Sequence, residues 1–402
     1  MAGSLAAATA ALAARPALAQ VSARPDAPAI IRGLPDVAVV GAGAFGGWTA
    51  LSLREAGAKV TLVDAYGPGN PRASSGDESR LLRLSYGARE LYTLWSQRAQ
   101  GLWEARQEEF GRRLFYPNGS LRVLDAEELP AQRTIFDRLA IPYEVLSGSE
   151  VNHRWPQVDL SEYEQVFYET TGGVVKAREA MIAVAEAFMH KGGTVRIGQA
   201  QMAPGSSGAL TVDGEPFSAG ACVFACGPWL PKVFPGLLGD RIRVPRREIF
   251  YVGSPMGDHR YRWEHLPNIS DTLTYTASDV DYGIKIAAAP RDTPMDPDTG
   301  DRMPTSFLQS EVEAYVARRM PGLVGQPIVA TRTCQTEYSD NSDFIIDRHP
   351  EHESVWIAGG GSGHAFKMGP AIGEYVAGRV LGRPGDPQAD ARFALASHGP
   401  AT

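Results

Sequence analysis

The amino-acid sequence predicts an α/β protein that combines a mainly parallel β-sheet with a second domain. The chain has 402 residues, well over twice the roughly 150 residues of a typical domain. It is 44% hydrophobic and 21% charged, which is ordinary for a globular protein, so a large core is available and wholesale disorder is excluded. The third observation is a strand, a glycine-rich loop, a helix and a second strand in succession over residues 36–64.

Each element of this succession has its own sequence pattern. Residues 37–40 are small or β-branched and predict a buried strand. Apolar residues along 50–53 predict a helix that ends near Gly57, and residues 59–63 predict a second strand that leads to Asp64. This order of elements is that of a Rossmann-like nucleotide-binding unit.

Three glycines in the loop predict what this unit binds. Gly41 permits the tight turn, Gly43 lets the backbone approach a pyrophosphate, and Gly46 lets the helix pack closely against the strand. The helix N-terminus offers free N–H groups to phosphates, and Asp64 can accept hydrogen bonds from ribose hydroxyls. The alternative is a tight turn that binds no ligand, and the motif by itself does not separate NAD from FAD.

Residues 1–30 are set apart from the rest of the chain. Residues 1–20 are alanine-rich and end in ALAQ, which resembles a signal-peptide cleavage site, but no basic residue precedes Arg15. A signal peptide that has lost its start, twin-arginine portion included, and a flexible alanine-rich tail both fit. The first predicts an exported, periplasmic protein and the second a cytoplasmic one. Residues 21–33 predict a linker, and the fold is expected to begin near Asp36.

Charge and cysteine content exclude several classes of function. The 39 Lys and Arg against 46 Asp and Glu give a net charge of −7, which argues against nucleic-acid binding. Three cysteines cannot form a disulfide framework, and without a CxxC pair no metal site is expected. Cys222 and Cys226 are interpreted as packing residues of a buried strand. No segment is long and apolar enough for stable membrane insertion.

Two further segments carry a resemblance to a known family. Residues 67–87 read GPGNPRASSGDESRLLRLSYG, and residues 334–374 include CQTEYSDNSDFIID and GSGHAFKMGP. Together with the glycine loop they resemble the FAD-dependent amine oxidases of the D-amino-acid-oxidase superfamily, above all the group of monomeric sarcosine oxidase and N-methyl amino acid oxidases. The likeness extends over about residues 36–380. It implies FAD as the cofactor.

The resemblance implies two domains that the chain enters more than once. A FAD-binding, Rossmann-like domain of the glutathione-reductase type would hold the cofactor. An α+β substrate domain built on an antiparallel sheet would cover the flavin ring. We assign residues 31–117, 166–235 and 343–395 to the first domain and residues 118–165 and 236–342 to the second.

The local sequence agrees with this division. Residues 176–190 read as an amphipathic helix, and residues 221–230 as a buried strand followed by a glycine turn. Residues 354–358 read as a strand that leads into a second glycine loop, with a helix expected from about Gly369.

The resemblance also implies which residues contact the cofactor. Related oxidases link a cysteine at the position of Cys334 to the flavin 8-methyl carbon through a thioether, and the alternative is a buried free thiol. The expected cofactor-binding residues are Gly41, Gly43, Ala44, Phe45, Gly46, Asp64, Ala65, Ser74, Ser75, Arg80, Leu81, Cys226, Gly227, Trp229, Cys334, Gly361, Gly363, His364, Ala365, Phe366 and Lys367.

Arg80 and Arg83 are expected to face the flavin and the substrate. They are three residues apart, which on a helix places them on one face. The resemblance implies that Arg80 lies over the flavin and that Arg83 grips a substrate carboxylate, a task suited to the planar guanidinium fork. The alternative is a pair of solvated arginines on the surface.

Two lysines complete the catalytic set. The resemblance implies that Lys367 reaches the substrate carboxylate and the pyrimidine edge of the flavin. It implies that Lys285 promotes the reaction of reduced flavin with oxygen, because a fixed cation stabilises the negative charge that forms. The alternatives are an exposed loop lysine and an outward-facing lysine on an edge strand, respectively. His364 could act as a base, but its neighbours favour packing against the cofactor.

The expected pocket departs from that of sarcosine-specific enzymes. Those enzymes carry a histidine where this chain has Ala289 and a tyrosine where it has Thr336, so both positions lose bulk and a polar tip. Tyr275 is expected to keep an aromatic wall. The carboxylate clamp is thus retained while recognition of the amine substituent is altered, which predicts a substrate other than sarcosine, larger or cyclic.

The predicted reaction is the oxidation of a carboxylate-bearing secondary amine, such as an N-substituted or cyclic amino acid. The products would be an imine and, with molecular oxygen as electron acceptor, hydrogen peroxide. The alternatives are a dehydrogenase of the same fold that passes electrons to a quinone or a partner protein, a flavin-bearing subunit without turnover, and an NAD-dependent reductase. The protein is expected to be a monomer or a small homo-oligomer.

Overall fold

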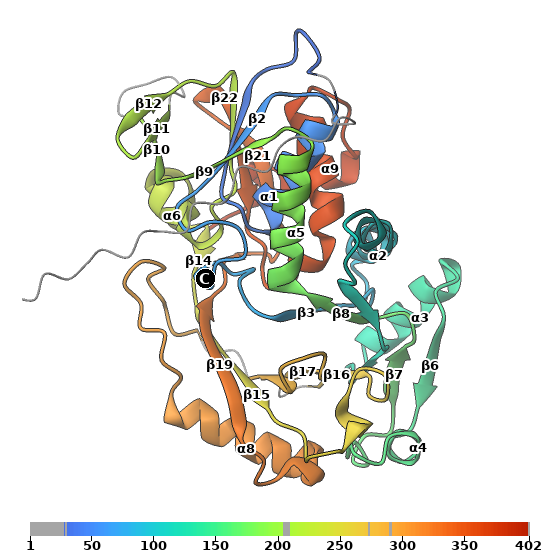
Figure 1. The fold of residues 1–402 in the computed structure, drawn as a ribbon. Helices are drawn as coiled ribbons and strands as arrows, with labels where there is room; N and C mark the ends of the chain where they lie inside the picture. Colours follow the sequence, from blue (N-terminus) through green and yellow to red (C-terminus); the bar gives the residue numbers. More distant parts are fainter. Residues whose placement is uncertain (1–27, 29, 204–209, 272–273, 289–291, 401–402) are drawn as a thin grey trace, which may run out of the picture.

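The computed structural model describes residues 28, 30–203, 210–271, 274–288 and 292–400. It shows two lobes, one built on a six-stranded sheet and the other on an eight-stranded sheet, and the chain passes between them several times (Figure 1). The expected export signal within residues 1–20 lies outside the described residues.

The first lobe is built on a sheet with the strand order β21-β22-β13-β1-β2-β9. All neighbouring strands in it are parallel except β21 and β22, which form an antiparallel hairpin. The predicted strands at 37–40, 59–63 and 354–358 are confirmed within a few residues. The strands are β1 (Val37–Val40), β2 (Val60–Asp64), β9 (Thr194–Ile197), β13 (Ala221–Phe224), β21 (Ile345–His349) and β22 (His352–Gly359).

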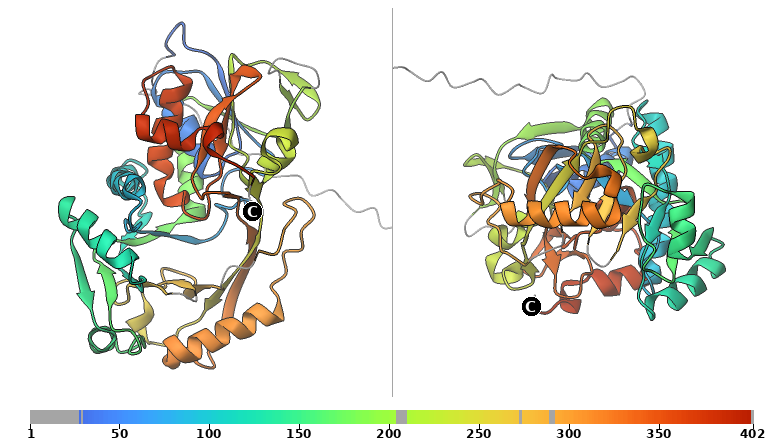
Figure 2. Two further views of the ribbon diagram at one scale, coloured as in Figure 1. Left: turned by 180° about the vertical axis from the view of Figure 1, so that it is seen from behind. Right: turned by 90° about the horizontal axis from the view of Figure 1, so that it is seen from below.

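Different elements cover the two faces of this sheet, as Figures 1 and 2 show. Alternation along β1 places Val37 and Val39 in one hydrophobic core and Ala38 and Val40 in another. The first core includes α1 (Ala44–Glu55), α2 (Glu90–Glu109), α5 (Ala177–His190), α9 (Gly369–Val380) and α10 (Pro387–Phe393). The second includes α6 (Leu230–Val233), α7 (Pro235–Leu238) and the small sheet of β10 (Ala200–Met202), β11 (Leu210–Val212) and β12 (Glu215–Phe217). The predicted helices at 176–190 and from Gly369 are thereby confirmed.

The second lobe is built on a sheet with the order β19-β15-β18-β17-β16-β5-β7-β6, in which only β16 and β5 are parallel. Helix α8 covers one face, seen from below in Figure 2, where Val312 and Val316 share a core with Phe250 and Ile286. The elements are β5 (Ser120–Arg122), β6 (Tyr143–Leu146), β7 (Val166–Glu169), β15 (Arg246–Val252), β16 (Asn268–Ser270), β17 (Tyr275–Ala277), β18 (Ile284–Ala287), β19 (Ile328–Gln335), α3 (Glu128–Arg138), α4 (Gly148–Arg154) and α8 (Ser306–Arg319).

A three-stranded sheet in the order β3-β8-β4 lies between the lobes and corrects one prediction. Arg80 belongs to strand β3 and Arg83 directly follows it, so these residues do not lie on a helix. Leu82 and Leu84 are buried on either side of the half-buried Arg83, a two-residue alternation that outweighs the three-residue spacing. The strands are β3 (Ser79–Leu82), β4 (Phe115–Pro117) and β8 (Gly173–Lys176), and a further pair is β14 (Ile242–Arg243) with β20 (Tyr338–Ser339).

The second correction concerns a domain boundary. Strand β7 begins at residue 166, which we assigned to the FAD-binding domain, but it pairs with β5 and β6 in the eight-stranded sheet. The chain therefore leaves this sheet after Glu169. The two sheets confirm the predicted α/β class with a largely antiparallel second sheet. Within the described part of the chain, no helix combines the length and the apolar character needed to cross a membrane.

Candidate active site

A cavity of about 1410 Å³ is lined by residues of both lobes. Pockets for drug-sized ligands measure roughly 300–1,000 Å³, so this one has room for an extended dinucleotide and a second molecule. Four of the expected residues do not line it: Gly46, Leu81, Lys285 and Lys367. The expected residues that do line it are Gly41, Gly43, Ala44, Phe45, Asp64, Ala65, Ser74, Ser75, Arg80, Arg83, Cys226, Gly227, Trp229, Tyr275, Cys334, Gly361, Gly363, His364, Ala365 and Phe366.

The glycine loop has the geometry that its sequence predicts. Gly41 has a φ of +104°, and a Cβ there would lie 2.3 Å from the carbonyl oxygen of Ala225, so only glycine fits. A Cβ on Gly46 would lie 1.9 Å from the carbonyl oxygen of Gly41, which explains the close packing of helix α1 on the loop. Gly43 is the N-cap of α1 and has no side chain, and the N–H of Ala44, the first helical residue, donates to the Ser75 hydroxyl at 3.1 Å; all three residues line the cavity.

Asp64 ends β2 at the wall of the cavity. Its Oδ2 accepts a hydrogen bond from the N–H of Ala42 (2.7 Å), and its Oδ1 accepts from the N–H groups of Tyr66 (2.8 Å) and Gly67 (2.7 Å). Burial raises the pKa of this carboxyl in spite of these three bonds. Because Oδ2 accepts only one of them, it keeps a lone pair for a ribose hydroxyl.

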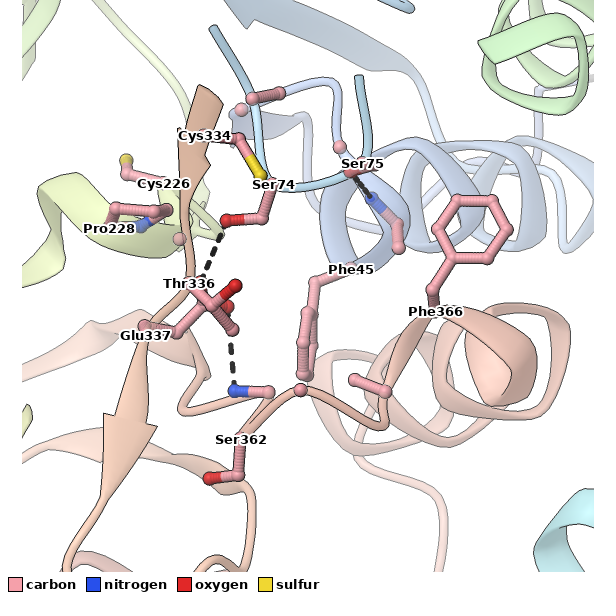
Figure 3. Close-up of a pocket in the computed structure, with 18 of the residues that line it drawn as sticks. Phe45, Ser74, Ser75, Cys226, Pro228, Cys334, Thr336, Glu337, Ser362 and Phe366 are labelled. Carbon is pink, nitrogen blue, oxygen red and sulfur yellow. Dashed lines mark hydrogen bonds between the residues drawn. The ribbon is translucent and has the colours of Figure 1, made fainter. Parts of the chain in front are cut away.

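Figure 3 shows a buried carboxyl group that the sequence analysis missed. Glu337 is 5% exposed and lines the cavity. Its Oε2 lies 3.2 Å from the hydroxyl of Ser74, and its Oε1 accepts a hydrogen bond from the N–H of Gly361 at 3.4 Å. Burial raises the pKa of Glu337. A single glutamate beside the expected Cys334 and Thr336 carries no motif, so only the structure reveals it.

The three cysteines occupy different surroundings. Cys334 is 6% exposed, lines the cavity and points toward Ser74 in Figure 3. Burial raises the pKa of its thiol, and the nearby charge of Arg80 opposes this only in part. Cys222 is packed in the core of the first lobe, as predicted, whereas Cys226 lines the cavity. Cys334 is therefore a buried residue of the cavity wall, and its link to the flavin stays a prediction.

Asp77 is the centre of a buried charge cluster. Its carboxylate forms ion pairs with Arg80 and with Lys285 (2.5 Å) and accepts a hydrogen bond from Tyr251 (2.7 Å). Burial alone would raise the pKa of Asp77, but the two cations and the hydrogen bonds hold it well below its usual range. Lys285 is 1% exposed on the inner strand β18 and also donates to the carbonyl of Ser79, so the alternative of an outward-facing lysine on an edge strand is wrong.

Tyr86 joins the two residues expected at the substrate carboxylate. The guanidinium carbon of Arg83 lies 4.5 Å from the centroid of its ring, and Nζ of Lys367 donates to its hydroxyl at 2.7 Å. The hydroxyl also lies 3.4 Å from Nδ1 of His364, whose Nε2 is 2.9 Å from the carbonyl oxygen of Ser342. Because a carbonyl only accepts, Nε2 carries the proton, and Nδ1 accepts from Tyr86.

Arg83 and Lys367 differ in what their charged groups contact. Lys367 and His364 are 5% and 9% exposed, so the alternative of an exposed loop lysine is wrong. Burial lowers the pKa of both groups well below their ordinary values; the charge of Arg83 adds to this for Lys367, and that of Lys367 adds to it for His364. Arg83 lines the cavity, whereas the amine of Lys367 contacts Tyr86 and the His364 carbonyl. His364 stacks on Phe344 at 5.0 Å and lines the cavity, and its packing against the cofactor stays a prediction.

Arg122 is a cavity residue that the sequence analysis missed. It ends β5, where strand alternation places Leu121 in the core of the second lobe and Arg122 on the cavity wall. Its Nη1 lies 3.2 Å from the carbonyl oxygen of Ser85, which also accepts a hydrogen bond from Arg83. Burial, and after it the charge of Arg83, lowers the pKa of Arg122 to about 10. A lone arginine in a three-residue strand belongs to no sequence motif, so the sequence alone did not predict its place in the cavity.

One part of the pocket wall is apolar or aromatic. Tyr275 lines it, as predicted, together with Ile249 and Ala287. Of the two expected departures, Thr336 lines the cavity and Ala289 lies outside the described residues.

A separate polar cluster lies at the turn between β21 and β22. His349, Glu351 and His352 place their ligand-type atoms within 4.8 Å of one another, although the sequence analysis expected no metal. The two imidazole rings stack at 4.6 Å, and burial together with His352 lowers the pKa of His349. None of the three residues lines the cavity.

Comparison with known protein families decides the identity of the fold. The model of the family DAO, described as FAD dependent oxidoreductase, matches residues 36–379. The chain belongs to this family. The match confirms the resemblance that we inferred from the sequence, and it confirms a FAD-dependent oxidoreductase.

Relatives of this DAO-family chain cover most of its length. The monomeric sarcosine oxidase of Bacillus sp. (strain B-0618) is 27% identical over 367 residues, 86% of this chain and 92% of that protein. The N-methyl-L-tryptophan oxidase of Yersinia pestis (strain Pestoides F) is 25% identical over 356 residues, with 85% and 94% covered. A modified fructosyl peptide oxidase from Aspergillus nidulans superposes with a TM-score of 0.80 at 17% identity over 92% and 96% of the two chains, which shows a common fold.

The residues of this DAO-family chain fit the cofactor of its family. The turn at Gly41 tolerates no Cβ, because one would lie 2.3 Å from the Ala225 carbonyl oxygen, and Gly43 and Ala44 at the N-terminus of α1 line the cavity. Gly41, Gly43 and Asp64 would therefore hold the pyrophosphate and a ribose of FAD.

Proposed function

We propose that the chain oxidises an amine that carries a carboxylate, with molecular oxygen as the electron acceptor and an imine and hydrogen peroxide as products. Arg83 is the observation that supports this most. Its guanidinium lines the cavity, and no carboxylate of the described residues forms an ion pair with it. Arg83 is half-buried, so its guanidinium is available to a ligand in the cavity, and a planar guanidinium binds a carboxylate through two parallel hydrogen bonds.

The chain contributes orientation to this reaction. Arg83, anchored by the Ser85 carbonyl and the ring of Tyr86, would hold the substrate carboxylate, and Tyr275 and Ile249 would offer apolar surface to the rest of the substrate. FAD supplies the acceptor for the hydride that leaves the carbon next to nitrogen, and its two electrons end on oxygen. The nitrogen must lose its proton for the imine to form, so we expect activity to rise toward alkaline pH.

Lys285 is proposed to promote the oxygen reaction. It is a buried cation joined through Asp77 to Arg80, which lines the cavity. Fixed positive charge at this place favours the build-up of negative charge during electron transfer to oxygen. The family resemblance, together with this burial and pairing, supports the assignment.

Cys334 is proposed to carry the flavin covalently. Its thiol is buried and lines the same cavity. A sulfur–carbon bond to the flavin 8-methyl group would replace one S–H and one C–H bond, and the two electrons and two protons would reduce oxygen to hydrogen peroxide. The test is acid precipitation of the purified protein. The pellet of the natural protein should be yellow, and that of Cys334→Ser colourless with a yellow supernatant.

The oxidase function is tested by spectroscopy of the purified holoprotein. N-methyl amino acids, cyclic imino acids and glycated amino acids are mixed with it without air, and bleaching of the flavin band reports reduction. Air is then admitted in a stopped-flow instrument. Return of the yellow colour within seconds supports an oxidase, whereas reduction followed by slow reoxidation would favour the dehydrogenase alternative. Failure of every amine to bleach the flavin would refute the proposal.

A further inference from the structure

Arg122 lines the cavity, but the proposed function gives it no role in binding the substrate. Arg83 directly follows β3 and Arg122 ends β5, yet both donate to the carbonyl oxygen of Ser85. Both line the cavity. Two like charges on half-buried side chains are therefore held side by side, which is unfavourable unless a ligand compensates for it.

Two polar atoms on this wall have no partner in the described part of the chain. Nε of Arg122 is buried without a hydrogen-bond acceptor, and the hydroxyl of Thr274 is buried without a partner as well. Both residues line the cavity. In the sheet Arg122 lies opposite Ser270, and Ser270 lies opposite Tyr275, the residue after Thr274. Arg122 on β5 and Thr274, directly before β17, thus lie on either side of β16, and both residues line the cavity.

The carboxyl groups near Arg122 do not neutralise it by direct contact. Glu169 accepts hydrogen bonds from the N–H groups of Leu84 (2.6 Å) and Ser85 (3.1 Å), and burial raises its pKa. Asp271, which also lines the cavity, pairs with the buried Arg319 at 2.8 Å.

Glu128 lines the cavity too and attracts Arg122 from a distance. Within the described ranges it forms no ion pair with that arginine. The combined effect of Glu169 and Glu128 is smaller than that of burial and Arg83, as the lowered pKa of Arg122 shows.

From this juxtaposition we propose that Arg122 and Thr274 form a second anion subsite, so that the substrate is an amine with two acid groups. The inference rests on the proposed function, in which Arg83 holds the first carboxylate beside Tyr86. The second carboxylate would accept hydrogen bonds from the Arg122 guanidinium and the Thr274 hydroxyl. It would be carried either on the side chain of an N-substituted acidic amino acid or on the nitrogen substituent, as in an iminodiacid.

A single carboxylate shared by both arginines is the competing arrangement. It would use the N–H groups of the two guanidiniums but leave the Thr274 hydroxyl, which lies across β16 from Arg122, without a hydrogen-bond partner. The two arrangements differ in one measurable respect: only a separate subsite makes the protein prefer a second negative charge.

Isothermal titration of the holoenzyme with acids that cannot react tests this preference without turnover. Glutarate is compared with butyrate on the natural protein and on Arg122→Gln, Arg122→Lys and Thr274→Val. Arg113→Gln is the control, because Arg113 lies over Trp263 at 4.2 Å and does not line the cavity. We expect glutarate to bind the natural protein at least about tenfold more tightly than butyrate. Arg122→Gln should abolish that preference and leave butyrate within about twofold.

The other variants sharpen the result. Arg122→Lys keeps the charge but loses the fork and should retain part of the preference, and Thr274→Val should reduce it by a few-fold. Equal affinity of the natural protein for both acids would overturn the proposal, as would Arg122→Gln weakening both acids by one common factor, the sign of a shared carboxylate. Flavin content of each variant reports its folding, and if Arg122→Gln does not fold, Arg122→Lys and Thr274→Val decide.

Turnover locates the second acid and separates this inference from the proposed function. N-methylglutamate is compared with its neutral isostere N-methylglutamine, and iminodiacetate with sarcosine. A preference for the acid in the first pair places the second group on the side chain, and in the second pair on the nitrogen. Oxidation of all four without preference would end the subsite proposal and leave the oxidase standing. Binding of glutarate without reduction by any amine would do the reverse.

Discussion

The two ends of the cavity are built in different ways. At the end near α1 and β2, the wall is made of backbone, with Gly41 and Gly43 followed within a short stretch of chain by Asp64. At the opposite end the wall is made of side chains, among them Arg83, which follows β3, and Arg122, which ends β5. Backbone geometry demands particular residues at fixed spacing, whereas a side-chain wall can be assembled from many places. Few residue types are therefore possible at the first end. At the second end, substitutions can change the substrate preference without disturbing the backbone.

The largest effect is expected where the backbone end is altered. Gly41→Ala would place a residue with a Cβ at a positive φ, which costs about 1–3 kcal/mol in stability. The new Cβ would also lie 2.3 Å from the Ala225 carbonyl oxygen, which would have to move. We expect colourless or insoluble protein, measured by flavin absorbance after purification. Gly101→Ala is the control, because a Cβ there meets nothing within 4 Å and α2 gains roughly 0.5–1 kcal/mol. Normal flavin content in Gly41→Ala would contradict the conclusion that backbone geometry at this end of the cavity demands glycine.

A second prediction concerns the charge cluster between the ends. Asp77→Asn leaves Lys285 and Arg80 without their shared carboxylate, and we expect a loss of about 3–5 kcal/mol in the free energy of unfolding. Asp36→Asn removes an exposed pair with Lys59 and should cost less than about 1 kcal/mol. Urea titration of both variants measures the comparison. Equal losses of unfolding free energy in the two variants would show that the buried cluster stabilises the protein no more than an exposed ion pair does.

The side-chain end should respond in activity rather than in folding. Arg83→Gln removes the charged fork, and we expect kcat/KM to fall by about ten- to a hundredfold with unchanged flavin content. Arg83→Lys should recover only part of this, since it keeps the charge without the bidentate geometry. Steady-state kinetics on the best amine of the screen provide the measurement. Unaltered kcat/KM in Arg83→Gln would show that Arg83 does not bind the substrate carboxylate.

The smallest effect is expected from Glu337, whose pKa is raised by burial. A carboxyl with a raised pKa binds more protons in the folded state than in the unfolded state, so its contribution to stability falls as pH rises above its ordinary pKa of 4.5. Glu337→Gln removes this dependence. The variant should match the natural protein below pH 4.5 and exceed it above, by no more than about 1.4 kcal/mol per pH unit. Thermal unfolding across pH measures the difference, and parallel curves would contradict it.

Prediction from the sequence succeeded where neighbouring residues cooperate. The strand at 37–40, the glycine loop and the helix at 176–190 follow from local pattern, and the cofactor motifs lie in short contiguous segments. The assignment of Arg80 and Arg83 to a helix failed because a three-residue spacing was given more weight than the alternation of buried Leu82 and Leu84.

The rest of the site depends on contacts between distant segments. Arg122 reaches Arg83 only because the Ser85 carbonyl lies between two sheets, and Glu337 faces Ser74 across 263 positions of sequence. Lys285 was singled out by resemblance, but its ion pair with Asp77, 208 positions away, could not be read from one sequence. Such contacts require the folded chain, because no local pattern encodes them.

The interleaving of the two sheets has a consequence for synthesis on the ribosome. Strand β1 needs β13, and β13 in turn needs β22, which ends at Gly359. At roughly 5–20 residues per second, the early βαβ unit waits on the order of 15–60 s before its last parallel neighbour emerges. During that interval an apolar strand edge stays open in the nascent chain, so a chaperone that shields it would raise the yield of soluble protein.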